Sequence, residues 1–209
     1  MNFLFLALIF LTHPTDPPCA YVAPDGAIVG TDVDLARKIA AEMGEELKVE
    51  GVDFETIIPR LKEGTADFGI ATITITEARR RDVDFSMPYE IGGACFMYRT
   101  DSPRPRMSQL ASLRIGVENG TTDDLYLCNH GCDPVRFVNM ADAVGALEKG
   151  QVDAIFFDCT PLRTWAKASN GKFSVTPLET RDRYGVAVSR KRPDVLAAAN
   201  RVIEKEVAK

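Results

Sequence analysis

The stretch Leu-Lys-Glu-Gly-Thr-Ala-Asp at residues 61–67 decides how the chain is organised, because a near copy, Leu-Glu-Lys-Gly-Gln-Val-Asp, recurs at residues 147–153. In each copy a helical pattern ends at a glycine that can adopt the left-handed conformation of a helix cap, and an aspartate then opens a strand. A Gly-Thr pair also precedes a helical pattern upstream of each copy, at residues 30–31 and 120–121. The repeat indicates two similar α/β lobes rather than one sheet.

Strand-like and helix-like patterns alternate around these copies. Apolar residues recur at helical spacing from Asp32 to Met43, and Gly44 follows as a stop signal. Further helices are expected at residues 54–63, 77–81, 121–127, 141–149, 161–168 and 193–207. Strands are expected at residues 47–52, 67–75, 89–98, 114–117, 135–138, 152–157, 174–177 and 184–189. This alternation predicts an α/β fold with mostly parallel sheets.

Composition bounds the class of protein. The 209 residues are 45% hydrophobic and 26% charged, as in an ordinary globular protein of one or two domains. Thirty acidic against 25 basic residues give a net charge of −5, which argues against a nucleic-acid-binding protein. No run of about 18 apolar residues occurs, so no membrane-spanning helix is expected.

The apolar run at residues 3–11 allows two interpretations. Its length suits the core of a signal peptide, but no Lys or Arg precedes it and no small-x-small cleavage site follows. A buried first strand is the alternative, because short apolar runs fit either.

Five cysteines leave at least one thiol outside any disulfide, and only Cys128 and Cys132 are close in sequence. A small disulfide-closed loop and two unpaired thiols both remain open for this pair. A metal knuckle with His130 is the weakest interpretation, because no fourth ligand is in view.

Two stretches could carry ligand chemistry. Thr72, Thr74 and Arg79 run from a strand end into a helix N-terminus, where amides, hydroxyls and a guanidinium could bind a carboxylate. The alternative is an alternating strand followed by a solvated basic run. Asp158 follows an apolar strand in the second lobe and could accept an ammonium group, or it could be a helix N-cap.

The chain resembles the periplasmic solute-binding proteins for polar amino acids, which are the receptors of ABC importers. The matching stretches lie at residues 17–21, 26–35, 53–61, 73–79, 83–89, 117–121 and 152–158, in the order and spacing of that family. The resemblance implies a type II periplasmic-binding-protein-like fold, with two mixed, mostly parallel sheets joined by a two-strand hinge. By analogy, residues 1–91 with 186–209 form lobe 1 and residues 92–185 form lobe 2. It also implies that the run ending at Leu11 is the first strand.

The resemblance also implies the roles of individual residues. Arg79 would bind the ligand α-carboxylate, helped by Thr72, Thr74, Thr121 and Thr122. Asp158 would take the α-ammonium group. Phe54 would pack on the ligand side chain, or serve only as a core aromatic.

Three positions depart from the usual pattern of the family. His13 stands where an acid or small polar residue is usual, Asp16 stands where an aromatic commonly stacks, and Glu118 lies beside the second-lobe loop. The two acids favour a ligand with a cationic or amide side chain, such as arginine, lysine or glutamine. The alternative for Asp16 is a side chain that points to solvent.

The expected function is therefore that of a periplasmic or extracellular receptor. It captures an L-amino acid in the cleft between the lobes by hinge closure and passes it to an ABC-transporter permease. We expect a monomer with no cofactor, no metal and no nucleic-acid partner. The alternatives are a dehydratase-like enzyme on the same fold, with Asp16, Glu118 or His13 as the acid, and a ligand-binding sensor domain.

Overall fold

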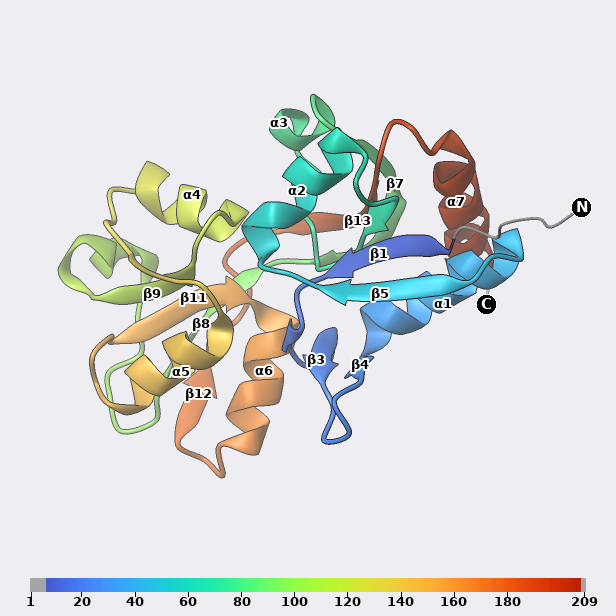
Figure 1. The fold of residues 1–209 in the computed structure, drawn as a ribbon. Helices are drawn as coiled ribbons and strands as arrows, with labels where there is room; N and C mark the ends of the chain where they lie inside the picture. The colour runs from blue at the N-terminus through green and yellow to red at the C-terminus, as the bar shows by residue number, and fades with distance from the viewer. Residues whose placement is uncertain (1–6, 208–209) are drawn as a thin grey trace, which may run out of the picture. The chain divides into compact units, whose positions relative to one another are not determined.

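The computed structural model describes residues 7–207, and the chain forms two compact units (Figure 1). Unit 1 contains Met1–Pro14, Cys19–Ile91 and Arg183–Lys209, and unit 2 contains Thr15–Pro18 and Gly92–Asp182. The sequence places the second crossing after residue 185 and assigns residues 15–18 to lobe 1. The contacts of the folded chain instead place that crossing after Asp182 and group Thr15–Pro18 with unit 2.

Unit 1 is built on a five-stranded sheet. Its spatial order is β5 (Leu47–Gly51), β1 (Leu8–Thr12), β6 (Phe68–Gly69), β13 (Asp182–Val188) and β7 (Asp84–Gly92). β1 pairs in parallel with β5 and β6, while β13 runs antiparallel to β6. The expected first strand is thus confirmed for Leu8–Thr12, and the part of the run at residues 3–6 lies outside the described residues.

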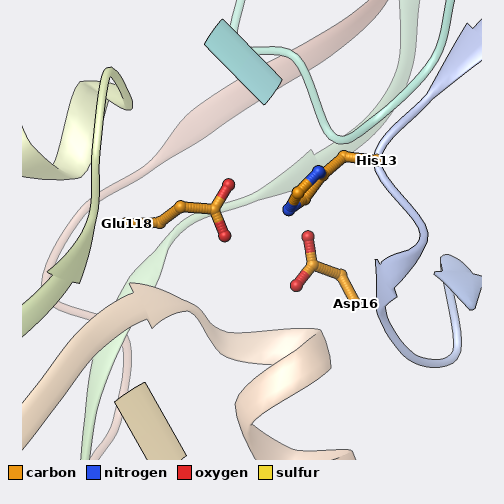
Figure 2. Close-up of side chains that lie close together, drawn as sticks. All are labelled: His13, Asp16 and Glu118. Carbon is orange, nitrogen blue, oxygen red and sulfur yellow. The ribbon is translucent and has the colours of Figure 1, made fainter. Parts of the chain in front are cut away.

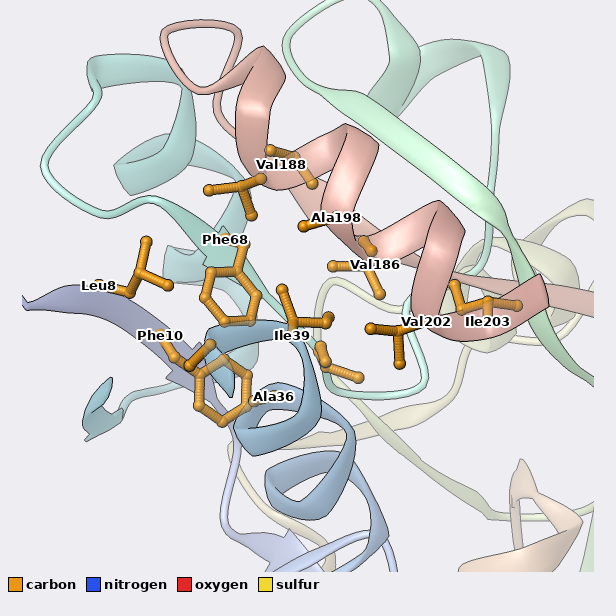
Figure 3. Close-up of a cluster of buried hydrophobic side chains, with 14 of the residues drawn as sticks. Leu8, Phe10, Ala36, Ile39, Phe68, Val186, Val188, Ala198, Val202 and Ile203 are labelled. Carbon is orange, nitrogen blue, oxygen red and sulfur yellow. The ribbon is translucent and has the colours of Figure 1, made fainter. Parts of the chain in front are cut away.

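Helices cover both faces of this sheet. On one face, α1 (Thr31–Met43) and α7 (Pro193–Val207) bury a stripe of residues against Phe10 and Phe68, whose rings stack 5.1 Å apart (Figure 3). On the other face, α2 (Phe54–Glu63) buries Ile57 and Leu61 against β1 and β6. The apolar positions of each helix recur at three- and four-residue spacing, so one side of the helix meets the sheet.

Smaller elements complete unit 1. β3 (Ala20–Val22) and β4 (Ile28–Val29) pair antiparallel, and α3 (Glu77–Arg80) begins at its N-cap residue Thr76. The strand expected at residues 67–75 is shorter than predicted. It ends at Gly69, and Thr74 forms only an isolated bridge with Tyr184, because the chain leaves the extended conformation at Thr72, where φ is 45°.

Unit 2 repeats the architecture. Its sheet has the order β10 (Val135–Phe137), β9 (Ile115–Glu118), β11 (Ala154–Asp158), β8 (Ala94–Arg99) and β12 (Phe173–Val175). β9 pairs in parallel with β10 and β11, whereas β8 runs antiparallel to β11 and β12. The helices of the unit are α4 (Thr122–Asn129), α5 (Met140–Glu148), α6 (Cys159–Ala168) and the short 3₁₀ helix η1 (Met107–Ser112). The predicted α/β class with two mixed sheets is confirmed, but parallel pairing does not predominate in unit 2, where β8 is antiparallel to both of its neighbours.

A disulfide crosses the core of unit 2. It joins Cys95 of β8 to Cys159 at the start of α6, and both residues are buried. The only pair that is close in sequence, Cys128 and Cys132, is not disulfide-bonded. The linked cysteines are 64 residues apart, so no local spacing signals their pairing.

No helix within residues 7–207 combines the length and the apolar composition needed to cross a membrane.

Candidate functional site

The residues predicted to hold a ligand divide between the two units. Unit 1 carries His13, Phe54, Thr72, Thr74 and Arg79. Unit 2 carries Asp16, Glu118, Thr121, Thr122 and Asp158. Within each unit these residues come from the ends of different strands or the starts of different helices. We call the five residues in each unit the half-site of that unit.

In unit 1, the guanidinium of Arg79 is held in place by its neighbours. Its backbone N–H donates to the Thr76 hydroxyl at 3.1 Å, and its Nη1 donates to the Thr74 carbonyl at 2.9 Å. The guanidinium carbon lies 5.3 Å from the centre of the Phe54 ring, a cation–π distance. Arg79 is therefore oriented rather than freely solvated, and Phe54 helps to orient it.

The two threonines of this half-site are buried, and Thr72 has an unusual backbone conformation. Thr72 and Thr74 are 8% and 9% exposed, and Thr72 has a φ of 45°, which a β-branched residue rarely adopts. Such strain costs about 1–3 kcal/mol and concentrates at binding and catalytic sites. The alternating strand that the sequence allowed here is therefore wrong.

His13 follows β1 directly and is buried, with 3% of its surface exposed. Its Nδ1 lies 2.8 Å from the Val52 carbonyl, and because a carbonyl only accepts, Nδ1 carries the proton. Burial lowers the pKa of His13 below its usual value, although the Val52 carbonyl and Asp53 oppose the shift. The ring is thus neutral near pH 7.

In unit 2, Thr121 and Thr122 form the N-terminus of α4. The Thr121 hydroxyl donates to the Glu118 carbonyl at 2.8 Å and accepts from the Asp124 N–H at 3.2 Å, so it caps the helix. The capping bond fixes the turn between β9 and α4. Thr122 is the first residue of the helix, where backbone N–H groups favour a negatively charged group.

Asp158 ends β11 and occupies the N-cap position of α6, with 8% of its surface exposed. Within the described chain its side chain accepts no capping hydrogen bond from that helix. Asp158 therefore occupies the predicted N-cap position, but its side chain does not make the capping hydrogen bond.

Asp16 of β2 (Thr15–Asp16) and Glu118 of β9 bring two carboxylates together in unit 2. Figure 2 shows the two side chains extending toward one another, and carboxylate oxygens of the two lie within 4.8 Å. Their exposed fractions are only 6% and 1%. The alternative in which Asp16 points to solvent is therefore wrong.

Several supporting contacts were not predicted. The backbone N–H of Ile75 donates to the Arg183 carbonyl at 2.9 Å, so the segment that carries Thr72 and Thr74 is braced by a strand more than 100 residues away. The contact between Phe54 and Arg79 is another example. Neither has a local sequence signal, because each joins segments that are adjacent only in the folded chain.

Known proteins resemble this chain over most of its length. The model of the family described as bacterial extracellular solute-binding proteins, family 3, matches residues 8–209. The arginine-binding periplasmic protein of Mannheimia haemolytica is 31% identical over 165 residues, which are 78% of this chain and 68% of that protein.

Solved structures agree. The arginine-bound form of ArgBP from T. maritima is 33% identical and has a TM-score of 0.91, with 95% of each chain covered. An ancestral arginine-binding protein bound to glutamine is 29% identical, with a TM-score of 0.90 over 97% of this chain and 92% of that one. These likenesses confirm the predicted type II periplasmic-binding-protein fold.

Proposed function

Because this chain belongs to the bacterial extracellular solute-binding proteins, family 3, we propose that it captures a free L-amino acid for uptake by an ABC transporter. The partner would be the membrane permease of that transporter, and the place of action periplasmic or extracellular. We propose capture of the ligand rather than its turnover, with the chain acting as a monomer. We also propose that the protein closes on its ligand, as the family resemblance implies.

We assign the ligand α-carboxylate to the half-site of unit 1. Arg79 offers a guanidinium whose position is already set by Thr74 and Phe54, so little side-chain entropy is lost on binding. The strained Thr72 and the buried Thr74 flank it. The backbone N–H groups at the start of α4, at Thr121 and Thr122, would be a second set of donors for the carboxylate.

The α-ammonium group is assigned to Asp158 of unit 2. Asp158 is buried at the end of β11, with 8% of its surface exposed. A buried carboxylate is stabilised by a cation at hydrogen-bond distance, and an ammonium group supplies one.

The observation that carries the choice of ligand is the pair formed by Asp16 and Glu118. Two buried carboxylates with oxygens within 4.8 Å repel one another when both are ionised. A guanidinium or ammonium group on the ligand side chain would offset that repulsion, whereas an amide would offset less of it. We therefore propose a basic amino acid as the ligand, with arginine first, as the similarity to arginine-binding proteins suggests.

His13 and Phe54 have supporting roles in this proposal. The neutral His13 ring donates through Nδ1 to the Val52 carbonyl, and this bond fixes the orientation in which the ring would meet the ligand. Phe54 packs against the Arg79 guanidinium and would also meet the aliphatic part of the ligand.

Titration calorimetry with each of the twenty amino acids tests the proposal. We expect arginine to bind most tightly and Arg79→Ala to weaken binding by roughly 30-fold or more, because loss of one partner of a buried charge pair costs about 2–5 kcal/mol. Arg80→Ala is the matched control, since Arg80 is the exposed neighbour on the same helix. Unchanged affinity in Arg79→Ala would refute the carboxylate assignment.

The ligand class is tested separately with Asp16→Asn and Glu118→Gln, which keep the shape of each side chain and remove its charge. For a basic ligand we expect each variant to lose affinity for arginine and to gain relative affinity for glutamine. An unaltered preference in both variants would contradict the role of the carboxylate pair while leaving the family function intact.

A further inference from the structure

The C-terminal end of α4 carries two thiols in a defined turn. The Cys132 N–H donates to the Leu127 carbonyl at 3.0 Å, and the Gly131 N–H donates to the Cys128 carbonyl at 3.1 Å. With Gly131 at a φ of 77°, these two bonds form a Schellman motif. The motif turns the chain back under the helix end, and so it brings Cys132 back toward the last turn, where Cys128 lies.

Cys128 is the exposed member of the pair and has polar neighbours that suit an attacking sulfur. The Arg136 Nη2 donates to the Cys128 Sγ at 3.1 Å, and the Cys128 thiol donates to the Asp124 Oδ1 at 3.6 Å. Arg136 is itself anchored, because its Nε donates to the Asp124 carboxylate at 2.9 Å. The guanidinium is thus fixed beside the sulfur of an exposed cysteine.

Cys132 is the buried member, with 6% of its surface exposed, and it packs in the core of unit 2 with Leu127 and Phe156. Burial raises the pKa of its thiol, and the nearby charge of Cys128 raises it further. The two sulfurs therefore differ: one is accessible and paired with a cation, and the other is shielded and held as the neutral thiol.

We propose that Cys128 and Cys132 form a thiol–disulfide exchange site that reacts with small disulfides. The Cys128 thiolate attacks one sulfur of the small disulfide and forms a mixed disulfide, and the other half leaves as a thiolate that takes up a proton. The Cys132 thiol then loses its proton as its sulfur attacks the Cys128 sulfur, and the second half of the small disulfide leaves with that proton as a thiol. Overall, two protein thiols become one disulfide, and one small disulfide becomes two thiols.

The product would close a short loop at the end of α4, on the opposite end of that helix from Thr122. It differs in kind from the bond between Cys95 and Cys159, which are 0% and 4% exposed and so are shielded from external thiols. A mild reductant followed by its removal should therefore reduce the surface pair and leave the buried disulfide intact.

The experiment treats the full chain, prepared in this way, with oxidised glutathione and follows its intact mass and peptide map. We expect transient addition of one glutathione moiety at Cys128, and then an end product that has lost two hydrogens and carries a Cys128–Cys132 linkage. A stable glutathione adduct with an alkylatable Cys132, or no reaction at all, would each overturn the proposal.

Matched variants separate the two sulfurs. Cys132→Ala should trap the glutathione adduct on Cys128, and Cys128→Ala should abolish adduct formation. Arg136→Gln should slow the first exchange roughly tenfold, the value of one charge-assisted hydrogen bond, while Arg136→Lys should retain more of the rate. Equal rates in Arg136→Gln and the unmodified chain would remove the guanidinium from the mechanism. Tryptophan fluorescence of Trp165, the single tryptophan, checks that each variant of unit 2 is folded.

Discussion

Asp67 in unit 1 and Asp153 in unit 2 occupy equivalent corners, each at the end of one copy of the repeated stretch. The preceding glycines, Gly64 and Gly150, have φ values of 73° and 69°. Asp67 accepts from the Ile9 N–H at 2.7 Å, and Asp153 accepts from the Arg114 N–H at 2.8 Å. Each aspartate therefore ties the end of a helix to the residue that begins, or lies next to, a central strand of its sheet.

The two corners differ in the arginine that completes them. Asp67 pairs at 2.6 Å with Arg192, which comes from the other end of the chain, and their side chains are 18% and 24% exposed. Asp153 pairs at 2.6 Å with Arg114, whose own N–H it already binds, and these side chains are 34% and 55% exposed. The same motif is thus a shielded long-range link in one unit and a solvated link in the other.

The same sequence motif therefore contributes a different free energy to the stability of each unit. Arg192 is the centre of a partly shielded network that also includes Asp194 and Glu45, and disrupting it is costly, whereas the exposed partners of a solvated pair are rehydrated when the pair is broken. Unit 2, with the weaker corner, has the disulfide between Cys95 and Cys159 as a second long-range link. We therefore expect the two units to depend on different bonds for stability.

The largest effect is expected for the disulfide of unit 2. Cys95→Ala combined with Cys159→Ala removes a link that closes 64 residues of chain, which a chain-entropy estimate values at about 4 kcal/mol. Urea unfolding followed by fluorescence of Trp165, which packs against this core, measures the loss. Cys128→Ala, at an exposed thiol, is the control and should change the free energy of unfolding by less than about 0.5 kcal/mol.

Next in size is Asp67→Ala in unit 1. The change removes the pair with Arg192 and the acceptor of the Ile9 N–H, while Arg192 keeps its pairs with Asp194 and Glu45. We expect the free energy of unfolding to fall by about 2 kcal/mol, measured by circular dichroism in urea. A double-mutant cycle with Arg192→Ala isolates the pair from the backbone bond to Ile9. A coupling energy near zero would show that this corner is no stronger than its counterpart.

Asp153→Ala in unit 2 should cost only about 1 kcal/mol, because its partner Arg114 is largely solvated. Hydrogen bonding from Arg114 lowers the pKa of Asp153 below its usual value, so this contribution is present near neutral pH and is lost in acid. Fluorescence-monitored unfolding at low and high salt checks the result. A loss as large as that of Asp67→Ala would contradict the comparison.

The smallest effect concerns His13, at the opposite end of the strand that Asp67 anchors. Burial lowers the pKa of His13, so the unfolded chain takes up a proton first as the pH falls through 6.5, and the folded state is destabilised. We expect the free energy of unfolding to decline below neutral pH, and His13→Gln to reduce that slope. A slope that His13→Gln leaves unchanged would contradict this role of the buried ring.

Local signals predicted the helices well. α2 was expected at residues 54–63 and has those bounds, since Gly64 supplies the left-handed cap. α1 and α7 also agree with their apolar spacing, and Thr76 caps α3 as predicted. The interactions that set the bounds of these helices lie within one or two helical turns. Apolar periodicity and capping residues are therefore enough to predict them.

Features that depend on contacts between distant parts of the chain were predicted poorly, because the sequence carries no local signal for them. The strand expected at residues 67–75 breaks at Thr72, and that unusual conformation is braced by backbone bonds to β13. Propensity alone favours a strand for Thr-Ile-Thr-Ile, and tertiary contacts override it. The bond between Cys95 and Cys159 could not be predicted for the same reason, because the two residues are 64 positions apart and adjacent only in the folded chain.

The candidate site shows both behaviours. Arg79 and Asp158 could be singled out from the residues alone, because each charged group follows a strand at the start of a helix. The burial of Asp16 against Glu118 could not, since alternation along a strand does not say whether a short segment is covered.

By itself, the sequence determined that two similar α/β lobes form, which helices bound them and which charged residues stand at their strand ends. Those properties depend on neighbours along the chain. Only the tertiary structure decided that Asp67 is shielded and Asp153 solvated, that Cys95 bonds to Cys159, and that Cys128 and Cys132 face the surface and the core. The physical reason is that burial and pairing are properties of segments brought together by packing.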